Sequence, residues 1–344
     1  MIDRLTKPLP VAPLQVRGDK RLPREGMTRI LVRGTNWIGD AVMTLPAVAA
    51  IRRTWPGAEI SVLAKPWVAD IYGEGADVDR VIIFAAPGEH EGPLGKLRLA
   101  GELRRRRFDM AILLQNAIEA AIIARLAGIP IRAGYDTDAR GWLLTHAVHR
   151  TRAIRRVHQI RYYLEMVRAL GCRGDGDDLR LKLRSETLAL ADSRLSATAL
   201  PGGTTFIGMA PGAAYGPAKR WPAERFAAVA AELHRKYPEA VLLLFGSGRD
   251  REVTDIVAAA LPDRVLNLAG ETSLREVMAL ISRCRVFVTN DSGLMHIAGA
   301  LNVPNVAIFG STDPTATSPP GDRNIIIRKP VDCSPCLKTV CPTD

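Results

Sequence analysis

Short apolar runs rich in β-branched residues alternate with amphipathic helical patterns, and this alternation restricts the fold more than any other feature of the sequence. Four runs in the first half have the length and composition of buried strands, at residues 29–33, 60–63, 81–84 and 110–114. A rhythm of strand, helix and strand is typical of βαβ units, whose strands pair in parallel. The sequence therefore predicts an α/β fold with a parallel sheet.

The rhythm stops between residues 171 and 203, in a stretch rich in Gly, Asp, Ser and Arg, and then starts again. Four more strand-like runs follow, at residues 206–210, 241–245, 286–289 and 305–309, and we expect the last of them to close the series. The sequence thus predicts two doubly wound, Rossmann-like domains that face each other across a cleft. We expect the chemistry to lie in loops at the carboxyl ends of the strands.

The same pattern predicts where each part of the chain begins and ends. The expected parts are a disordered leader over 1–27, an N-terminal domain over 28–184, an interdomain connection over 185–204, a C-terminal domain over 205–330 and a cysteine-containing tail over 331–344. The leader has charged residues and prolines scattered through it and no apolar core. It therefore does not resemble a secretory signal.

The charge balance indicates an anionic partner. The 344 residues include 47 Lys and Arg against 36 Asp and Glu, a net charge of +11. Aromatic residues make up only 5% of the chain and no nucleic-acid motif accompanies the basic runs, so we do not expect nucleic acid. The arginines at 104–107 and 150–161 form either solvated faces or a surface for an anionic glycolipid or membrane. Arg152, Arg155 and Arg156 are the candidates for that surface.

The cysteines and the hydropathy pattern bear on location. Five cysteines, an odd number, argue against a secreted disulfide framework, and no apolar stretch approaches the 18 residues of a membrane span. A cytoplasmic location is therefore expected. Cys333, Cys336 and Cys341 form a tight group. A zinc site requires a fourth ligand, and none lies nearby in the sequence. We therefore favour a structural or adventitious cluster and expect no metal.

The first candidate loop, Gly34–Asp40, follows the first predicted strand and precedes a helix expected to begin at Ala41. Its two glycines are five positions apart and no Gly-Lys-Ser/Thr follows, so it is neither a dinucleotide fingerprint nor a P-loop. An aspartate at such a junction can serve only as the helix N-cap. Alternatively, Asp40 is a general base that takes the proton of an attacking hydroxyl.

The second candidate loop, Pro211–Pro222, places two cations beside the start of a predicted helix. Pro222 fits the first helical position, so Lys219 and Arg220 would lie near the positive end of the helix dipole. That arrangement is costly unless an anion joins it, which favours a phosphate site. The alternative is a solvated basic loop with Trp221 as a packing residue.

The third candidate, Val288–His296, runs from a buried strand through Asn-Asp-Ser-Gly into an amphipathic helix. Backbone N–H groups, a hydroxyl and a small residue meet there, which suits the approach of a diphosphate. His296, near the end of the first helical turn, can reach the same place. In the alternative, Asp291 or Ser292 only caps the helix and His296 is a half-buried core residue.

Taken together, these motifs closely resemble those of glycosyltransferase family 9, and within it the type II ADP-heptose:lipopolysaccharide heptosyltransferases. The resemblance extends from about Thr28 to Cys341 and rests on the segments at 34–40, 211–222, 245–250 and 289–296. It implies a GT-B fold. It also implies an inverting transfer of L-glycero-D-manno-heptose from ADP-heptose to the first heptose of the lipopolysaccharide inner core.

The resemblance assigns roles to individual residues. Asp40 corresponds to the catalytic base and Lys219 to the lysine that contacts the donor phosphates. The donor-binding segment corresponds to Asp291, Ser292, Gly293 and His296, and Asp250 lies where the family places groups near the nucleoside. The implied partners are ADP-heptose, a lipid A inner-core glycolipid and the cytoplasmic face of the inner membrane. No cofactor is expected, because fixed N–H donors and a lysine stabilise the leaving ADP.

Three alternatives remain open from the sequence. Heptosyltransferases I and III would share the donor loops and differ in the acceptor. A GT-B-like nucleotide-sugar epimerase would share the architecture and need no acceptor. A non-enzymatic protein that binds anionic surfaces would release no ADP.

Overall fold

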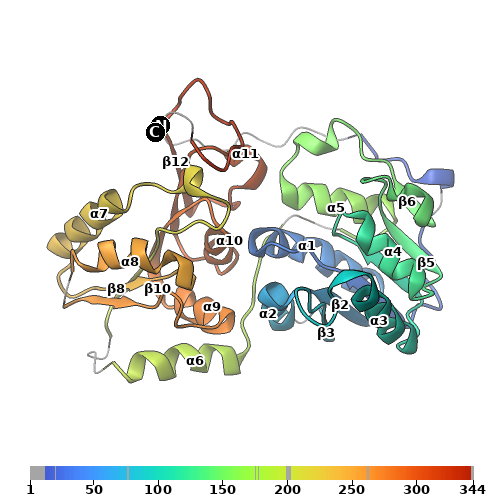
Figure 1. The fold of residues 1–344 in the computed structure, drawn as a ribbon, viewed down its shortest axis with the longest axis horizontal. Coiled ribbons are helices and arrows are strands. Elements are labelled where there is room, and N and C mark those ends of the chain that lie inside the picture. Colours follow the sequence, from blue (N-terminus) through green and yellow to red (C-terminus); the bar gives the residue numbers. More distant parts are fainter. Residues whose placement is uncertain are drawn as a thin grey trace. The chain divides into compact units, whose positions relative to one another are not determined.

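The computed structural model describes residues 12–19, 21–75, 77–174, 176, 178–198, 203–261 and 263–341. The chain forms two compact units, and the boundary between them lies between Arg180 and Leu181 (Figure 1). Within the described residues, no helix combines the length and the hydrophobicity needed to cross a bilayer.

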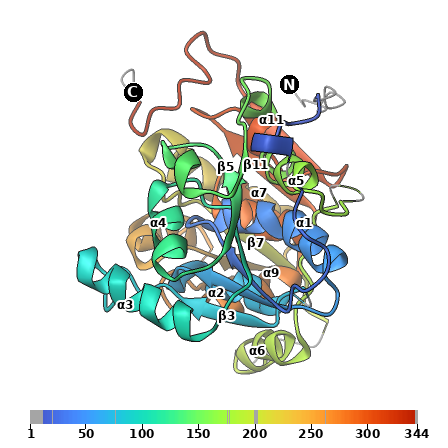
Figure 2. The same cartoon turned by 90° about the vertical axis from the view of Figure 1, so that its right-hand side faces the viewer.

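The N-terminal unit is built on a parallel sheet in the order β3-β2-β1-β4-β5-β6. Its strands are β1 Arg29–Arg33, β2 Glu59–Ala64, β3 Arg80–Ile83, β4 Met110–Leu113, β5 Ile131–Tyr135 and β6 His146–Val148. Its helices are α1 Ile38–Thr54, α2 Pro66–Glu74, α3 Gly92–Arg105, α4 Ile118–Leu126 and α5 Gln159–Ala169. Helix α1 packs against α2 and α5, while α3 packs against α4 on the other side of the sheet (Figure 2).

Burial of the strands explains their composition. Strands β1 and β4 are covered on both faces, and Ile30, Val32 and Ile112 are fully buried. Near-continuous apolar runs are what a parallel sheet between two helical layers requires. Helix α1 begins at Ile38, three residues before the expected start, and Pro46 lies inside it.

The C-terminal unit has a second parallel sheet, in the order β12-β11-β10-β7-β8-β9. Its strands are β7 Phe206–Ala210, β8 Val241–Leu244, β9 Val265–Asn267, β10 Cys284–Asn290, β11 Asn305–Phe309 and β12 Asn324–Arg328. Its helices are α6 Ser185–Ser196, α7 Ala223–Lys236, α8 Arg251–Ala258, α9 Leu274–Ser282, α10 Gly293–Ala300 and α11 Pro314–Thr317.

Both sheets have the same topology. Counted from the first strand of each unit, the order is 3-2-1-4-5-6, so the direction of winding reverses between β1 and β4 and again between β7 and β10. In doubly wound sheets, ligands bind beyond the carboxyl ends of the strands at such a switch point. The loops that follow these four strands are therefore the places to look for function.

Three expectations differ from the structure. Strand β11 does not close the series, because β12 pairs with it along the sheet edge. The predicted interdomain connection, 185–204, includes α6, which packs against α9. That packing places α6 in the C-terminal unit, so the division falls earlier in the chain than expected.

The leader prediction was wrong for the described residues 12–19 and 21–27. Val16 forms an antiparallel bridge with Val148, and Leu22 is buried and donates its N–H to the carbonyl of Leu170. The indole of Trp55 also donates to the carbonyl of Pro23. These contacts hold the segment in place, although its composition is polar on average. Residues 1–11 lie outside the described part of the chain.

Candidate active-site loops

One buried side chain joins the loops that follow β7 and β10. Asn290, the last residue of β10, is fully buried. Its Nδ2 donates to the carbonyl oxygen of Pro211 at 2.6 Å, and its Oδ1 accepts the N–H of Trp221 at 3.0 Å. Buried amides are expensive to leave unsatisfied, so these two bonds fix both ends of the 211–222 loop beside the switch point.

The Lys219 ammonium lies where three loops meet. Its Nζ is 2.6 Å from Oδ2 of Asp291, in the loop after β10, and 4.8 Å from the ring centroid of Tyr215. The same Asp291 oxygen accepts the hydroxyl of Thr312, in the loop after β11, at 2.5 Å. Asp291 is only 4% exposed. A charge-assisted pair held in this way fixes the lysine head group in one place.

Helix α10 begins directly beside this ion pair. Ser292 is its N-cap and Gly293 its first residue, and the Ser292 side chain makes no capping hydrogen bond. The Ser292 hydroxyl instead lies 3.2 Å from that of Thr289. The positive end of the helix is thus bordered by small residues, which suits an anion. His296 is buried further along the same helix.

Asp250 and Arg220 form a second ion pair in the C-terminal unit. The Asp250 carboxylate lies 3.2 Å from Nη2 of Arg220 and accepts the N–H and the hydroxyl of Ser247 at 3.0 and 2.7 Å. A Cβ on Gly212 would lie 2.4 Å from Oδ1 of Asp250. The carboxylate therefore joins the 211–222 loop to the loop after β8, and Gly212 leaves the space that it occupies. Pro222 is the N-cap of α7 and not its first helical residue.

Asp40 lies in the first turn of α1 in the N-terminal unit. The N-cap of this helix is Trp37, so the interpretation of Asp40 as the N-cap was wrong. A carboxylate in a first turn is nevertheless favoured by the helix dipole. Tyr163 of α5 is in electrostatic range: burial, and then the negative charge of Asp40, raise the pKa of the Tyr163 phenol well above its ordinary value.

Two buried cations lie at the carboxyl ends of β1 and β2. Arg33 is 2% exposed and donates to the carbonyls of Gly34 and Leu63 at 2.5 and 3.2 Å and to Oδ1 of Asn36 at 2.8 Å. Lys65 is 8% exposed; its Nζ donates to the carbonyl of Ala86 at 2.5 Å.

No carboxylate among the described residues forms an ion pair with Arg33 or Lys65. The Lys65 ammonium instead lies 3.8 Å from the ring centroid of Phe84. Burial lowers the pKa of Arg33 to about 10, and burial and the nearby Arg33 lower the pKa of Lys65. Glu119 opposes both shifts from a distance, but its carboxylate is paired with Lys96 at 2.6 Å. Buried charges without a direct ion pair are costly, so this end of the sheet is suited to an anionic ligand.

Two exposed tryptophans border the same loop. Trp37 precedes α1 and Trp67 lies in the first turn of α2, and both indoles are exposed. The Trp67 Nε1 donates to the carbonyl of Asn36 at 2.7 Å, which fixes α2 against the Gly34–Asp40 loop. Exposed aromatic faces beside a candidate site offer apolar contact surface to a ligand.

The predicted basic surface lies on the N-terminal unit. Arg152, Arg155 and Arg156 are exposed, the last two in the 3₁₀ turn Ile154–Arg156. None of the three forms an ion pair with another residue that the structure describes. The run at 104–107 is also exposed and ends α3. These positive charges therefore face solvent.

The tail cysteines are free thiols, and Cys333 is exposed while Cys336 and Cys341 are partly buried. Over the ranges that the structure describes, no group of three or more His, Cys, Asp or Glu side chains is arranged to hold a metal ion.

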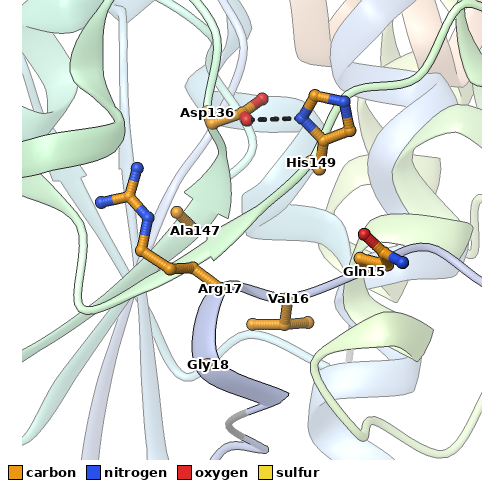
Figure 3. Close-up of a pocket in the computed structure, with 7 residues that line it drawn as sticks. All are labelled: Gln15, Val16, Arg17, Gly18, Asp136, Ala147 and His149. Carbon is orange, nitrogen blue, oxygen red and sulfur yellow. Dashed lines mark hydrogen bonds and ion pairs between the residues drawn. The ribbon is translucent and has the colours of Figure 1, made fainter.

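A separate pocket of about 470 Å³ lies in the N-terminal unit, where the segment around Val16 meets β6. Figure 3 shows the ion pair on its wall, in which Nδ1 of His149 lies 2.9 Å from Oδ2 of Asp136. Burial opposes ionisation of Asp136, but the Arg150 N–H and His149 outweigh it and hold the pKa of this carboxyl below its ordinary value. The pocket is lined by none of the predicted site residues.

Several residues of these loops were not found from the sequence. Thr312 and Tyr215 contact the predicted pair of Lys219 and Asp291, but each stands in a loop whose path the sequence does not reveal. Arg33 and Lys65 had one available signal. Each is a lone cation next to a run of apolar residues that was itself expected to be buried.

Comparison with known proteins matches these observations to one family. The model of glycosyltransferase family 9 (heptosyltransferase) matches residues 96–344. Lipopolysaccharide heptosyltransferase 2 of Escherichia coli K12 is 33% identical over 87% of this chain and 88% of its own length. Lipooligosaccharide heptosyltransferase 2 of Haemophilus influenzae is 33% identical with the same coverage. A relative from Pseudomonas aeruginosa, named lipopolysaccharide heptosyltransferase 1, is 29% identical over 91% of this chain and 87% of its own length. One from E. coli, named lipopolysaccharide heptosyltransferase 3, is 26% identical over 80% of this chain and 81% of its own length.

A solved structure agrees with the sequence comparison. That of E. coli ADP-heptose lipopolysaccharide heptosyltransferase II superposes with a TM-score of 0.75 and 30% identity, covering 87% of this chain and 90% of its own. The expected GT-B architecture, with two Rossmann-like parallel sheets, is confirmed. This chain belongs to glycosyltransferase family 9 and is a glycosyltransferase.

Proposed function

We propose that this enzyme transfers L-glycero-D-manno-heptose from ADP-heptose to the first heptose of the lipopolysaccharide inner core, with inversion at the anomeric carbon. The observation that carries the proposal is the fixed Lys219 ammonium at the uncapped start of α10. The names of the relatives at 33% identity support this choice of donor and acceptor.

The donor diphosphate is expected to lie on the C-terminal unit. Lys219 and the N–H groups at Ser292 and Gly293 would bind it, because an ammonium and a helix N-terminus both favour negative charge. Asp291 would act through Lys219: its carboxylate would repel a phosphate, but it holds the lysine in place. Asp250 would similarly hold Arg220 and the loops around the nucleoside. His296 would support α10 from the buried side.

The diphosphate gains negative charge as the bond to the sugar breaks. Groups already aimed at the developing charge lower the barrier without needing to reorganise. The ion pair to Asp291 and the contact with Tyr215 hold Lys219 in this way before the donor binds. These interactions would stabilise the leaving ADP through residues of this chain.

The acceptor half of the reaction is assigned to the N-terminal unit. Asp40 would take the proton of the acceptor hydroxyl as that oxygen attacks the anomeric carbon from the face opposite the leaving group. The buried positive charges of Arg33 and Lys65 lie at the same end of the sheet. We expect them to favour the anionic groups of an inner-core glycolipid over a neutral acceptor.

An acceptor series tests this function. Purified core glycolipids truncated at successive stages would be incubated with ADP-heptose and analysed by mass spectrometry. One heptose should be added to the glycolipid that already bears a single inner-core heptose. Transfer to the heptose-free glycolipid would indicate a type I enzyme, and transfer only to longer cores a type III enzyme. A change in the sugar without acceptor would indicate an epimerase.

We further propose that the enzyme works at the cytoplasmic face of the inner membrane, through the exposed arginines at 152, 155 and 156. Each basic residue near an anionic bilayer contributes about 1 kcal/mol, and the attraction weakens with salt. Binding of the triple Arg→Gln variant to acceptor-bearing anionic vesicles should fall at least tenfold in sedimentation assays. Unchanged binding, or binding insensitive to salt, would contradict this role.

A further inference from the structure

The tail after β12 lies against the loops that hold Lys219. The carbonyl oxygen of Thr339 accepts the N–H of Ala218 at 3.0 Å, and that of Leu337 accepts the hydroxyl of Tyr215 at 2.7 Å. These two contacts are on the 3₁₀ turn Pro217–Lys219 and the residues just before it. The tail is therefore hydrogen bonded to the segment that carries the Lys219 side chain.

The same tail is also attached to the loop after β11. The N–H of Leu337 donates to the carbonyl of Ser311 at 2.8 Å, and the hydroxyl of Ser334 donates to the carbonyl of Gly310 at 2.6 Å. Arg328 of β12 donates to the carbonyl of Ser334 at 2.7 Å. Thr312, the residue after Ser311, is the one that bonds Asp291. The tail thus links two of the three loops that meet at Lys219.

A glycine makes this close approach possible. Gly216 has φ of 150°, and a Cβ built on it would lie 2.4 Å from the carbonyl oxygen of Thr339. No side chain fits in that space, and a φ in this range is unfavourable for any residue other than glycine. The loop sequence Tyr215-Gly216 is therefore suited to a tail that lies directly on the backbone.

The tail is held mainly by hydrogen bonds of its backbone, together with the Ser334 hydroxyl, and not by a core of its own. Val331, Leu337 and Val340 are at least 50% exposed, so these apolar side chains contribute little burial. Hydrogen bonds connect it to the loops after β7 and β11 and to Arg328 of β12. Such a segment can set the position of a loop while contributing little to the stability of the unit.

We propose that the tail, residues 331–341, is a positioning element of the donor site: by bonding Tyr215 and Ala218 it fixes the place of the Lys219 ammonium and so sets affinity for a nucleoside diphosphate. This rests on the proposed role of Lys219. It gives the cysteine-containing tail a function in donor binding that does not depend on the thiols.

Two variants of the full chain test the proposal, with ADP as the probe in calorimetry. Gly216→Ala forces the tail off the loop, and Tyr215→Phe removes the bond to Leu337 while keeping the ring under Lys219. We expect the ADP Kd to rise about tenfold for Gly216→Ala and about threefold for Tyr215→Phe, as the loss of positioning hydrogen bonds implies. Val340→Ala, on an exposed side chain of the same tail, is the matched control and should bind ADP as the unaltered chain does.

Steady-state kinetics separates positioning from damage to the fold. Both variants should raise the KM for ADP-heptose and leave the KM for the acceptor and the Tm nearly unchanged. Equal ADP affinity in all four proteins would overturn the inference, as would a parallel rise of both KM values with a lowered Tm. If the unaltered chain bound no ADP, the proposed donor site itself would be wrong, which is a distinct result.

Discussion

The two sets of loops differ in how their charges are balanced. In the C-terminal unit Lys219 is paired with Asp291 and Arg220 with Asp250, at 2.6 and 3.2 Å. In the N-terminal unit Arg33 and Lys65 are buried, and no carboxylate of the described chain pairs with either. Paired charges fix geometry, whereas an uncompensated buried charge favours an anion from outside.

This difference suggests a division of labour. The C-terminal loops are organised before the donor arrives, so binding there costs little reordering. The N-terminal loops keep buried positive charge at the strand ends that forms no direct ion pair within the described chain, at a cost in stability that the anionic acceptor would offset. A change in one unit should therefore alter the KM of the substrate assigned to that unit and leave the KM of the other substrate unchanged.

The largest effect is expected from Asp40→Asn. This change removes the base and leaves a side chain of the same shape, so turnover should fall by about 10² to 10⁴. The KM for ADP-heptose should stay within about twofold, because the donor loops are untouched. Heptose transfer measured under single-turnover conditions checks the chemical step. Turnover like that of the unaltered enzyme would remove Asp40 from the mechanism.

Next in size is the loss of the fixed ammonium. Lys219→Met should raise the KM for ADP-heptose by about 10 to 100-fold, since a charge-assisted contact is worth roughly 1.5 to 3 kcal/mol. The KM for the acceptor should not change. A matched control is Lys236→Met, on an exposed lysine at the end of α7. A change in acceptor KM alone for Lys219→Met would reverse the assignment of the two units.

Lys65→Met should raise the acceptor KM about tenfold and leave donor KM unchanged, because one charge-assisted contact is lost. It should also stabilise the protein, since no carboxylate among the described residues forms an ion pair with the buried ammonium and burial is the largest influence on its pKa. The pKa of Lys65 is lowered in the folded state, so folding is opposed by its charge at neutral pH.

The pH dependence of Lys65 has a definite sign. The unfolded chain binds more protons at this lysine than the native chain over the range between the lowered and the ordinary pKa, so its contribution to stability rises with pH there. Acceptor KM should rise over the same range as the charge is lost. Denaturant titrations and kinetics at several alkaline pH values check both trends. Lys65→Met lacks the titrating ammonium, so neither trend should be seen in that variant.

The smallest effect is expected from Thr312→Val. The valine keeps the shape and removes the hydroxyl that donates to Asp291, one of the bonds that hold the pair with Lys219. Loss of about 0.5 to 1 kcal/mol should raise the KM for ADP-heptose roughly two- to fivefold. Thr312→Ser keeps a hydroxyl, so its KM for ADP-heptose should equal that of the unaltered enzyme. If serine and valine behave alike, the hydroxyl does not position Asp291.

The eight strands β1–β4, β7, β8, β10 and β11, and the turns at the switch points, were predictable because they rest on local pattern. Buried parallel strands such as β1 and β10 are continuous apolar runs, and Asn-Asp-Ser-Gly after such a run is typical of a turn into a helix. Strands β5, β6, β9 and β12 were missed, and the last three of these lie at sheet edges. In β12, Ile325 and Ile327 are exposed, and the Gly- and Pro-containing stretch before it resembles a loop.

Long-range contacts were not predictable from the sequence. Nothing in the sequence around Thr339 or Leu337 shows that their carbonyls meet a loop more than 110 residues earlier. The burial of Lys65 depends on Phe84 and Ala86, which come from the end of the next strand. Local motifs nominate the candidate residues, but the interactions that hold them come from the paths of other segments.

The most direct test of the division between the two units is calorimetric titration of ADP into Lys219→Met and Lys65→Met, side by side with the unaltered enzyme. The structure predicts that ADP binds Lys65→Met with unchanged Kd and binds Lys219→Met at least about tenfold more weakly. Equal weakening in both variants, or weakening in Lys65→Met alone, would contradict the assignment of the donor to the C-terminal loops.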